Sequence, residues 1–178
     1  MIDPSSTLVD VAFAICTALD QAGVRAVLVG GSAATFYTGA YQSLDVDFVL
    51  TFNPAGADAR GAVEGLGFRL EGSHYAHPIV DYTVDFLGGP AGIGDDIVTD
   101  FHIARRGDQL LRVYTRTDAV RDRLAGYYHW PDRSSLRVAV SVARSGPIDL
   151  AAIESWSASE GASEKFEEFV RALKGEPM

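Results

Sequence analysis

The chain has 178 residues, of which 47% are hydrophobic and only 22% are charged. This length and composition predict one domain, or one domain with a helical appendage, and they exclude global disorder because the apolar side chains suffice for a core. The formal net charge of −9 argues against broad nonspecific binding to nucleic acid.

Targeting and compartment signals are few. No apolar run approaches the length of a membrane span, and residues 1–4 do not start a basic region followed by an apolar one, so we expect neither a membrane contact nor a signal peptide. Cys16 is the only cysteine, which excludes an internal disulfide and fits a reducing compartment. We therefore expect a cytoplasmic protein.

The first half of the chain alternates between helical and strand patterns. Apolar residues at helical spacing predict a helix over 5–22, which Gly23 would end, and Asn53 is a candidate N-cap for a later helix. The predicted elements that follow are a strand over 25–30, a short helix over 31–38, a strand over 44–51, a helix over 57–66, and strands over 68–70, 75–78 and 81–87.

The second half begins with a glycine-rich stretch and becomes helical. We expect residues 88–96 to form a flexible loop and residues 101–105 and 110–114 to form a hairpin around Gly107. Thr117 is a candidate N-cap for a helix that stops before Pro131, and further helices are predicted over 133–144, 149–156 and 163–173.

This order of elements predicts an α+β fold. A small mixed β-sheet with flanking helices, the α/β core, would occupy residues 1–115, and a helical region packed on that core would occupy residues 116–178.

Two aspartates stand two residues apart inside an apolar run. Because side chains alternate along a strand, Asp45 and Asp47 share one face, while Val46 and Phe48 lie on the other. Neighbouring carboxylates repel and resist burial, so the pair needs a countercharge. A bound divalent cation supplies one when the ligands are hard oxygens.

A Gly-Gly-Ser turn precedes this strand. Gly30, Gly31 and Ser32 lie where the predicted strand over 25–30 ends and the short helix over 31–38 begins, so their backbone amides are suited to holding phosphate. A third carboxylate, Asp85, lies on a later strand, and Asp81 is a competing choice on the same face. Together, a phosphate cradle and metal-binding carboxylates indicate nucleotide chemistry.

This combination resembles the nucleotidyltransferase superfamily, whose fold is shared by polymerase beta and the minimal nucleotidyltransferases. The resemblance covers about residues 24–88 and rests on the Gly-Gly-Ser turn, the Asp-x-Asp strand and the third carboxylate. It implies two Mg²⁺ ions bound by Asp45, Asp47 and Asp85, with an NTP held by Gly30, Gly31 and Ser32. Asp85 would also help to deprotonate the hydroxyl of the acceptor.

The segment 117–136 carries a second resemblance. It is similar to the helical part of small prokaryotic nucleotidyltransferase-like proteins related to the transferase toxins of type IV abortive-infection systems. In that group a basic helix residue often contacts the nucleotide, a role that Arg121 or Arg123 would take here, although the usual lysine of the family is missing. The resemblance implies a toxin-like role and an antitoxin partner.

Charge is spread unevenly along the chain. Residues 105–144 contain nine arginines and four aspartates, so this segment carries +5 and the remainder carries −14. Such a split marks either a nucleotide or RNA contact surface or arginines on solvated faces.

We therefore expect a Mg²⁺-dependent enzyme that transfers NMP from an NTP to an acceptor hydroxyl of a tRNA, a protein or a small molecule. The alternative is a catalytically inactive protein of the same fold that binds a nucleotide or a partner.

Overall fold

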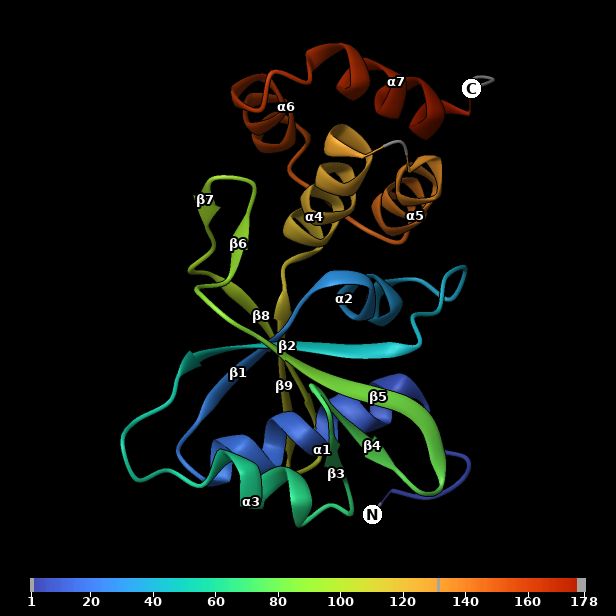
Figure 1. Ribbon diagram of the computed structural model, residues 1–178. Helices are drawn as coiled ribbons and strands as arrows, with labels where there is room; N and C mark the ends of the chain where they lie inside the picture. Colours follow the sequence, from blue (N-terminus) through green and yellow to red (C-terminus); the bar gives the residue numbers. More distant parts are fainter. Residues whose placement is uncertain (1, 131, 176–178) are drawn as a thin grey trace.

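A computed structural model describes residues 2–130 and 132–175. Strands occupy the first two thirds of this range and helices alone the last third (Figure 1). The helices are α1 (Leu8–Gln21), α2 (Gly30–Tyr37), α3 (Ala59–Glu64), α4 (Arg116–His129), α5 (Arg133–Arg144), α6 (Leu150–Ser159) and α7 (Ser163–Lys174). The strands are β1 (Arg25–Leu28), β2 (Asp45–Phe52), β3 (Arg69–Glu71), β4 (His74–His77), β5 (Val80–Leu87), β6 (Gly92–Ile93), β7 (Asp96–Ile97), β8 (Phe101–Arg106) and β9 (Gln109–Tyr114).

Seven strands form one mixed sheet in the order β3-β4-β5-β2-β1-β9-β8. β2 pairs in parallel with β5 and antiparallel with β1, while β1 pairs in parallel with β9. The mixed sheet and its flanking helices confirm the expected α+β fold. Because β2 and β1 are central, residues on β2 are held on both sides by hydrogen-bonded neighbours.

Helices cover the sheet from different sides. α1 packs against β1, β2 and β9 and also contacts α3, whereas α2 packs against β2 and α4. In Figure 1, α1 and α3 lie below the sheet, α2 lies above it, and α4 to α7 form a helical layer beyond α2. α4 therefore joins the helical region to the core through its contacts with α2, β6 and β9.

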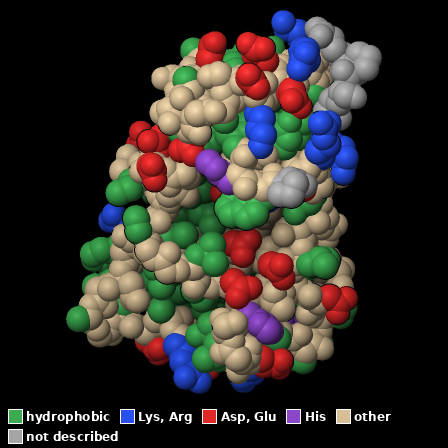
Figure 2. Space-filling model, turned by 45° about the horizontal axis from the view of Figure 1, so that its top comes forward, with side chains coloured by type: hydrophobic (Ala, Val, Ile, Leu, Met, Phe, Trp, Pro, Cys, Tyr) green, Lys and Arg blue, Asp and Glu red, His purple; other side chains and the backbone are tan. Residues whose placement is uncertain are grey.

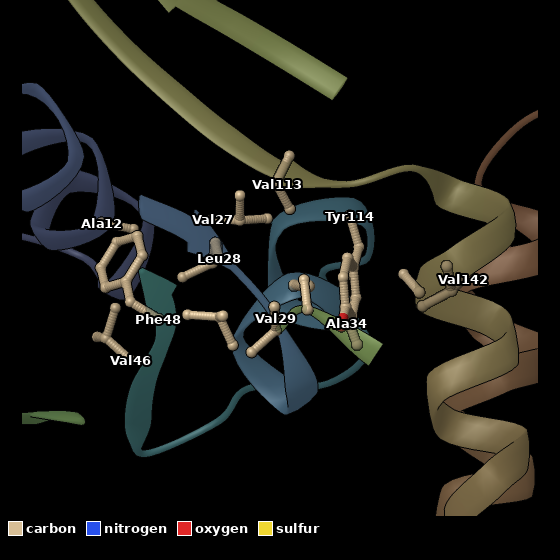
Figure 3. Packing of buried hydrophobic residues seen from close by; sticks show 14 of the residues in the cluster. Ala12, Val27, Leu28, Val29, Ala34, Val46, Phe48, Val113, Tyr114 and Val142 are labelled. Carbon is tan, nitrogen blue, oxygen red and sulfur yellow. The ribbon is translucent and has the colours of Figure 1, made fainter. Parts of the chain in front are cut away.

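The alternating side chains of the central strands form the hydrophobic core. Val46 and Phe48 are fully buried and point from β2 toward Ala12 of α1 (Figure 3). On the other side, Tyr114 lies between Ala34 of α2 and the helical region (Figure 3). Alternation of inward apolar and outward polar residues on β2 is what leaves its aspartates on the opposite face from Phe48.

Three details differ from the expectations. The N-cap of α4 is Thr115 rather than Thr117, since the Thr115 hydroxyl accepts a hydrogen bond from the Asp118 amide. Asp58 rather than Asn53 caps α3, through the Gly61 amide. Residues 88–96 are not a plain loop, because β6 and the start of β7 lie within them and pair as a hairpin.

The hairpin was missed because its strands are only two residues each and carry no alternation. Tertiary contacts hold it: the Tyr114 hydroxyl donates to the Gly92 carbonyl at 3.1 Å, and Asp96 pairs with Arg121 of α4. Among the described helices, none combines the length and the hydropathy needed to cross a membrane.

Candidate functional site

Strand register brings the predicted carboxylates together. In the parallel pair of β2 and β5, Asp47 lies opposite Asp85, and Asp45 lies opposite Thr83, whose hydroxyl donates to the Asp45 carboxylate at 2.7 Å. All four side chains belong to the same face of the sheet. Asp81 is exposed and lies outside the paired register of these two strands. Of the two candidates on β5, the geometry therefore places Asp85 beside Asp47.

The glycine turn lies against Asp47. Gly30 has a φ of +63°, and a Cβ at this position would be 2.9 Å from the Asp47 Oδ2 atom. A Cβ on Gly31 would be 2.8 Å from the Tyr41 hydroxyl. Because neither position has room for a side chain, glycine lets the start of α2 approach Asp47 at residue 30 and Tyr41 at residue 31.

Ser32 joins the turn to the aspartate strand. Its side chain is fully buried, its hydroxyl donates to the Val29 carbonyl at 2.7 Å, and it accepts from the Asp47 amide at 3.1 Å. Both hydrogen bonds of the hydroxyl are therefore made within the protein, so any phosphate contact at Ser32 would come from its backbone N–H. In the part of the chain that the structure describes, no side chain caps the start of α2, and free amides of a first helical turn favour anions.

Electrostatic repulsion is concentrated on Asp47. Partial burial, and then the charges of Asp45 and Asp85, raise the pKa of Asp47 to about 6. Arg123 acts in the opposite direction and lowers this pKa. The carboxylate therefore carries an unfavourable negative charge at neutral pH that a bound cation would relieve.

A pocket of about 470 Å³ opens over this carboxylate. Its walls come from the start of α2, from β2, from the segment that joins β5 to β6, and from α4. The volume falls in the usual range for small-molecule sites. Its lining residues include Gly30, Gly31, Tyr41, Ser43, Asp47, Gly88, Gly92, Tyr114, Asp122 and Arg123.

The two predicted basic residues of α4 have different surroundings. Arg123 lines the pocket, and its guanidinium binds the neighbouring Asp122 with hydrogen bonds of 2.9 and 2.5 Å. Arg121 does not line it: its guanidinium pairs with Asp118 and Asp96 and lies 5.0 Å from the ring centroid of Trp156. Geometry thus selects Arg123 as the arginine that could reach a ligand here.

The donor set fits a hard divalent cation, although no closed cage is formed. Asp45, Asp47 and Asp85 offer carboxylate oxygens on one face, and the raised pKa of Asp47 reflects their mutual repulsion. Over residues 2–130 and 132–175, no three His, Cys, Asp or Glu side chains converge closely enough to constitute a preassembled metal site. Any such centre would need a rotation of these side chains toward the ion.

Several pocket residues lay beyond the sequence-based prediction. Tyr41 and Ser43 come from the loop between α2 and β2, and Asp122 holds Arg123. The only signal for Asp122 was its position beside Arg123, and nothing in the loop sequence distinguished Tyr41 and Ser43. Thr83 could have been found, since it shares the face of Asp85 on a strand with clear alternation.

Most arginines of the basic segment serve internal contacts. Ion pairs join Arg106 to Asp10, Arg112 to Asp20 and Arg133 to Glu168, and Arg144 donates to the Ala172 and Leu173 carbonyls at the end of α7. On the face shown in Figure 2, acidic side chains gather near the middle, while Lys and Arg lie mainly toward the upper and lower ends. The charge split along the sequence is thus largely neutralised in the fold.

Comparison with known proteins identifies a similar fold. No protein-family model and no curated protein sequence matches the chain. Among solved structures, an antigenic nucleotidyltransferase-like protein from Paracoccidioides brasiliensis superposes with a TM-score of 0.64 at 15% sequence identity. The match covers 97% of this chain and 94% of that one. The chain therefore has a nucleotidyltransferase-like fold.

Proposed function

We propose that the protein is a Mg²⁺-dependent nucleotidyltransferase that moves NMP from an NTP to an acceptor hydroxyl. The observation that carries this proposal is the placement of Asp47 opposite Asp85 on neighbouring strands, with the Asp47 carboxylate at the position that a side chain on Gly30 would occupy. Gly30, Gly31 and Asp47 line the same pocket, and Asp85 lies beside Asp47 on the neighbouring strand, outside the lining of that pocket.

Residues in and around the pocket each have a role in this proposal. The amides of Gly30, Gly31 and Ser32 would hold the triphosphate, and the absence of side chains on the two glycines permits its close approach. Asp45, Asp47 and Asp85 would bind two Mg²⁺ ions, which supply neutralisation of the charge that develops on the transferred phosphoryl group. Arg123 would contact the nucleotide once its guanidinium leaves Asp122.

Transfer of label from each α-³²P NTP tests the proposal. With Mg²⁺ and with total tRNA, lysate protein or small hydroxyl compounds as acceptors, we expect wild-type protein to label one class. Asp47→Asn and Asp85→Asn should each reduce labelling at least about 100-fold, because removing a carboxylate leaves the cations and the developing charge without a ligand.

Asp81→Asn is the matched control, since it makes the same chemical change on the same strand outside the paired register. It should leave labelling within about twofold of wild type. Equal losses in the Asp81 and Asp85 variants would contradict the assigned third carboxylate, and wild-type protein that neither binds NTP nor labels any acceptor would overturn the proposed reaction.

The proposed reaction has three possible classes of acceptor, a tRNA, a protein or a small molecule. With five of the nine arginines of 105–144 in ion pairs and Arg144 bound to backbone carbonyls, the argument for RNA from the charge split is weakened. A toxin-like role with an antitoxin partner belongs to the tRNA and protein classes, and it stands only if one of these macromolecules is labelled.

A second candidate function is a nucleotide-binding module without catalysis. The specific observation in its favour is that the carboxylates do not converge on a preassembled metal site in the described residues. Such a protein would bind NTP in the same pocket without labelling any acceptor, and Asp85→Asn would leave its nucleotide affinity unchanged.

A further inference from the structure

A second cavity lies at the other end of α2. It measures about 680 Å³ and is lined by Phe36 and Tyr37 from α2, by Phe101 and His102 from β8, and by residues 115–117 and Pro147 from the helical region. α2 has eight residues, so its two ends are about 12 Å apart. The cavity is thus separate from the pocket over Asp47 and plays no part in the proposed transfer reaction.

Aromatic rings form its wall. The ring centroid of His102 lies 6.0 Å from that of Phe36 and 6.4 Å from that of Tyr37, and the Phe36 and Tyr37 rings meet edge to face at 4.9 Å. The Tyr37 hydroxyl donates to the Tyr114 carbonyl at 2.7 Å, which fixes the ring in place. Rings arranged in this way offer faces and edges on which a planar ligand can stack.

The guanidinium of Arg116 lies beside these rings. The guanidinium of Arg116 lies 4.9 Å from the Tyr37 ring centroid, and a Cβ on Gly146 would be only 2.6 Å from its central carbon. Tyr37 and the missing side chain of Gly146 therefore create the space in which this guanidinium sits.

A positive charge at residue 116 does not stabilise α4. Arg116 is the first residue of α4, where the helix dipole disfavours positive charge. Within the described residues it forms no ion pair, its Nε atom is buried without a partner, and its hydrogen bond to the Pro147 carbonyl is long, at 3.4 Å. Arg106, Arg112, Arg121 and Arg123 all have carboxylate partners. Arg116 thus retains donors for an external anion.

We propose that this cavity binds a planar aromatic molecule that carries one anionic group, with the ring stacked against Phe36, Tyr37 and His102 and the anion on Arg116. Two kinds of molecule have this chemistry, a nucleoside monophosphate and a small aromatic carboxylate. The volume of about 680 Å³ accommodates either.

Calorimetric titration of the full chain in EDTA tests the site, because EDTA removes divalent ions from the pocket over Asp47. The probes are AMP and indole-3-carboxylate. Adenosine and indole supply a ring without the charge, and inorganic phosphate and acetate supply a charge without the ring. We expect at least one of the two complete probes to bind, at least about tenfold more tightly than its ring-only and charge-only counterparts.

Variants locate the binding. Arg116→Gln should weaken the bound probe about tenfold or more, and Gly146→Ala should weaken it as well by displacing the guanidinium without altering any aromatic residue. His102→Ala, at an exposed position, should cost about fivefold or more through lost stacking. Arg105→Ala, exposed on the same strand, and Arg123→Gln, in the other pocket, should leave the affinity within about twofold.

Three results of this titration would contradict the proposed second site. The proposal is overturned if neither AMP nor indole-3-carboxylate binds, if the charge-only probes bind as tightly as the complete ones, or if Arg123→Gln weakens binding while Gly146→Ala and His102→Ala do not. Because this experiment contains no metal and no NTP, loss of nucleotidyl transfer elsewhere leaves its result unaffected.

Discussion

At the scale of single residues, Asp47 connects all parts of the candidate site. It lies opposite Asp85, its carboxylate touches the position where Gly30 lacks a side chain, and its amide is held by Ser32. The same residue carries the raised pKa, about 6. A carboxylate held among like charges costs stability, which is acceptable where a ligand removes that cost.

Asp47→Asn should therefore stabilise the metal-free protein. The folded pKa of about 6 exceeds the ordinary value of 3.8, so the penalty grows as pH rises from about 4 to 6 and is complete above that. Discounted for partial solvent screening, the free energy of unfolding should rise by about 1 kcal/mol at pH 8. The gain should be smaller at pH 5.

Thermal unfolding in EDTA at both pH values measures this effect. Asp81→Asn, at an exposed position on the same face, serves as the control and should leave the midpoint nearly unchanged. An Asp47→Asn protein that unfolds at a lower temperature than wild type at pH 8 would show that the carboxylate is not under electrostatic strain.

At the scale of elements, the site depends on how the start of α2 is fixed to β2. Ser32 links the two elements, because its buried hydroxyl donates to the Val29 carbonyl before α2 and accepts from the Asp47 amide on β2. Thr35 makes a second connection, accepting from the Ser43 amide at 2.9 Å and so holding the loop that contributes Tyr41. These bonds keep the phosphate turn and the aspartate strand in register.

Ser32→Ala should lower the free energy of unfolding by about 1–3 kcal/mol, since it leaves a buried amide and a buried carbonyl without this partner. Urea denaturation measures the loss, and Ser73→Ala, in the exposed turn between β3 and β4, is the matched control. NTP affinity should fall together with stability if the hydroxyl positions the turn. Unchanged affinity would mean that the turn keeps its shape without this bond.

At the scale of the whole molecule, the fold decides how much of the positive charge of residues 105–144 is paired with acids. The chain carries −9 overall and +5 over residues 105–144, yet five of the nine arginines in that segment pair with acids from α1, the β6–β7 hairpin, α4 and α7. Exposed positive charge is thereby reduced, and so is the attraction to phosphate backbones.

We accordingly expect weak binding of bulk tRNA. At about 150 mM salt, an electrophoretic shift assay should show no complex at low-micromolar protein, because few phosphate contacts are available to release counterions. A basic nucleic-acid-binding protein assayed beside it checks the conditions. A tight complex whose affinity falls steeply with salt would contradict this expectation and would favour RNA as the acceptor.

Local pattern was enough to predict much of the fold. α1, β2, β5 and the β8–β9 hairpin were predicted within a few residues, and α5 over its full length, because their apolar periodicity and terminal residues are unambiguous. The β6–β7 hairpin was not predictable, since its two-residue strands depend on Tyr114 and Arg121, which lie far along the chain.

The sequence by itself determined which residues share a face and where backbone amides are free, since alternation along β2 and β5 and the glycines at the start of α2 are local properties. Tertiary structure alone decided which of those groups meet. It set Asp85 rather than Asp81 beside Asp47 through the parallel register and placed Arg123 in the pocket and Arg121 outside it. It also left Arg116 without a carboxylate partner among the described residues. Such choices depend on contacts between segments distant in sequence, because strand register and ion pairing are fixed only when those segments pack together.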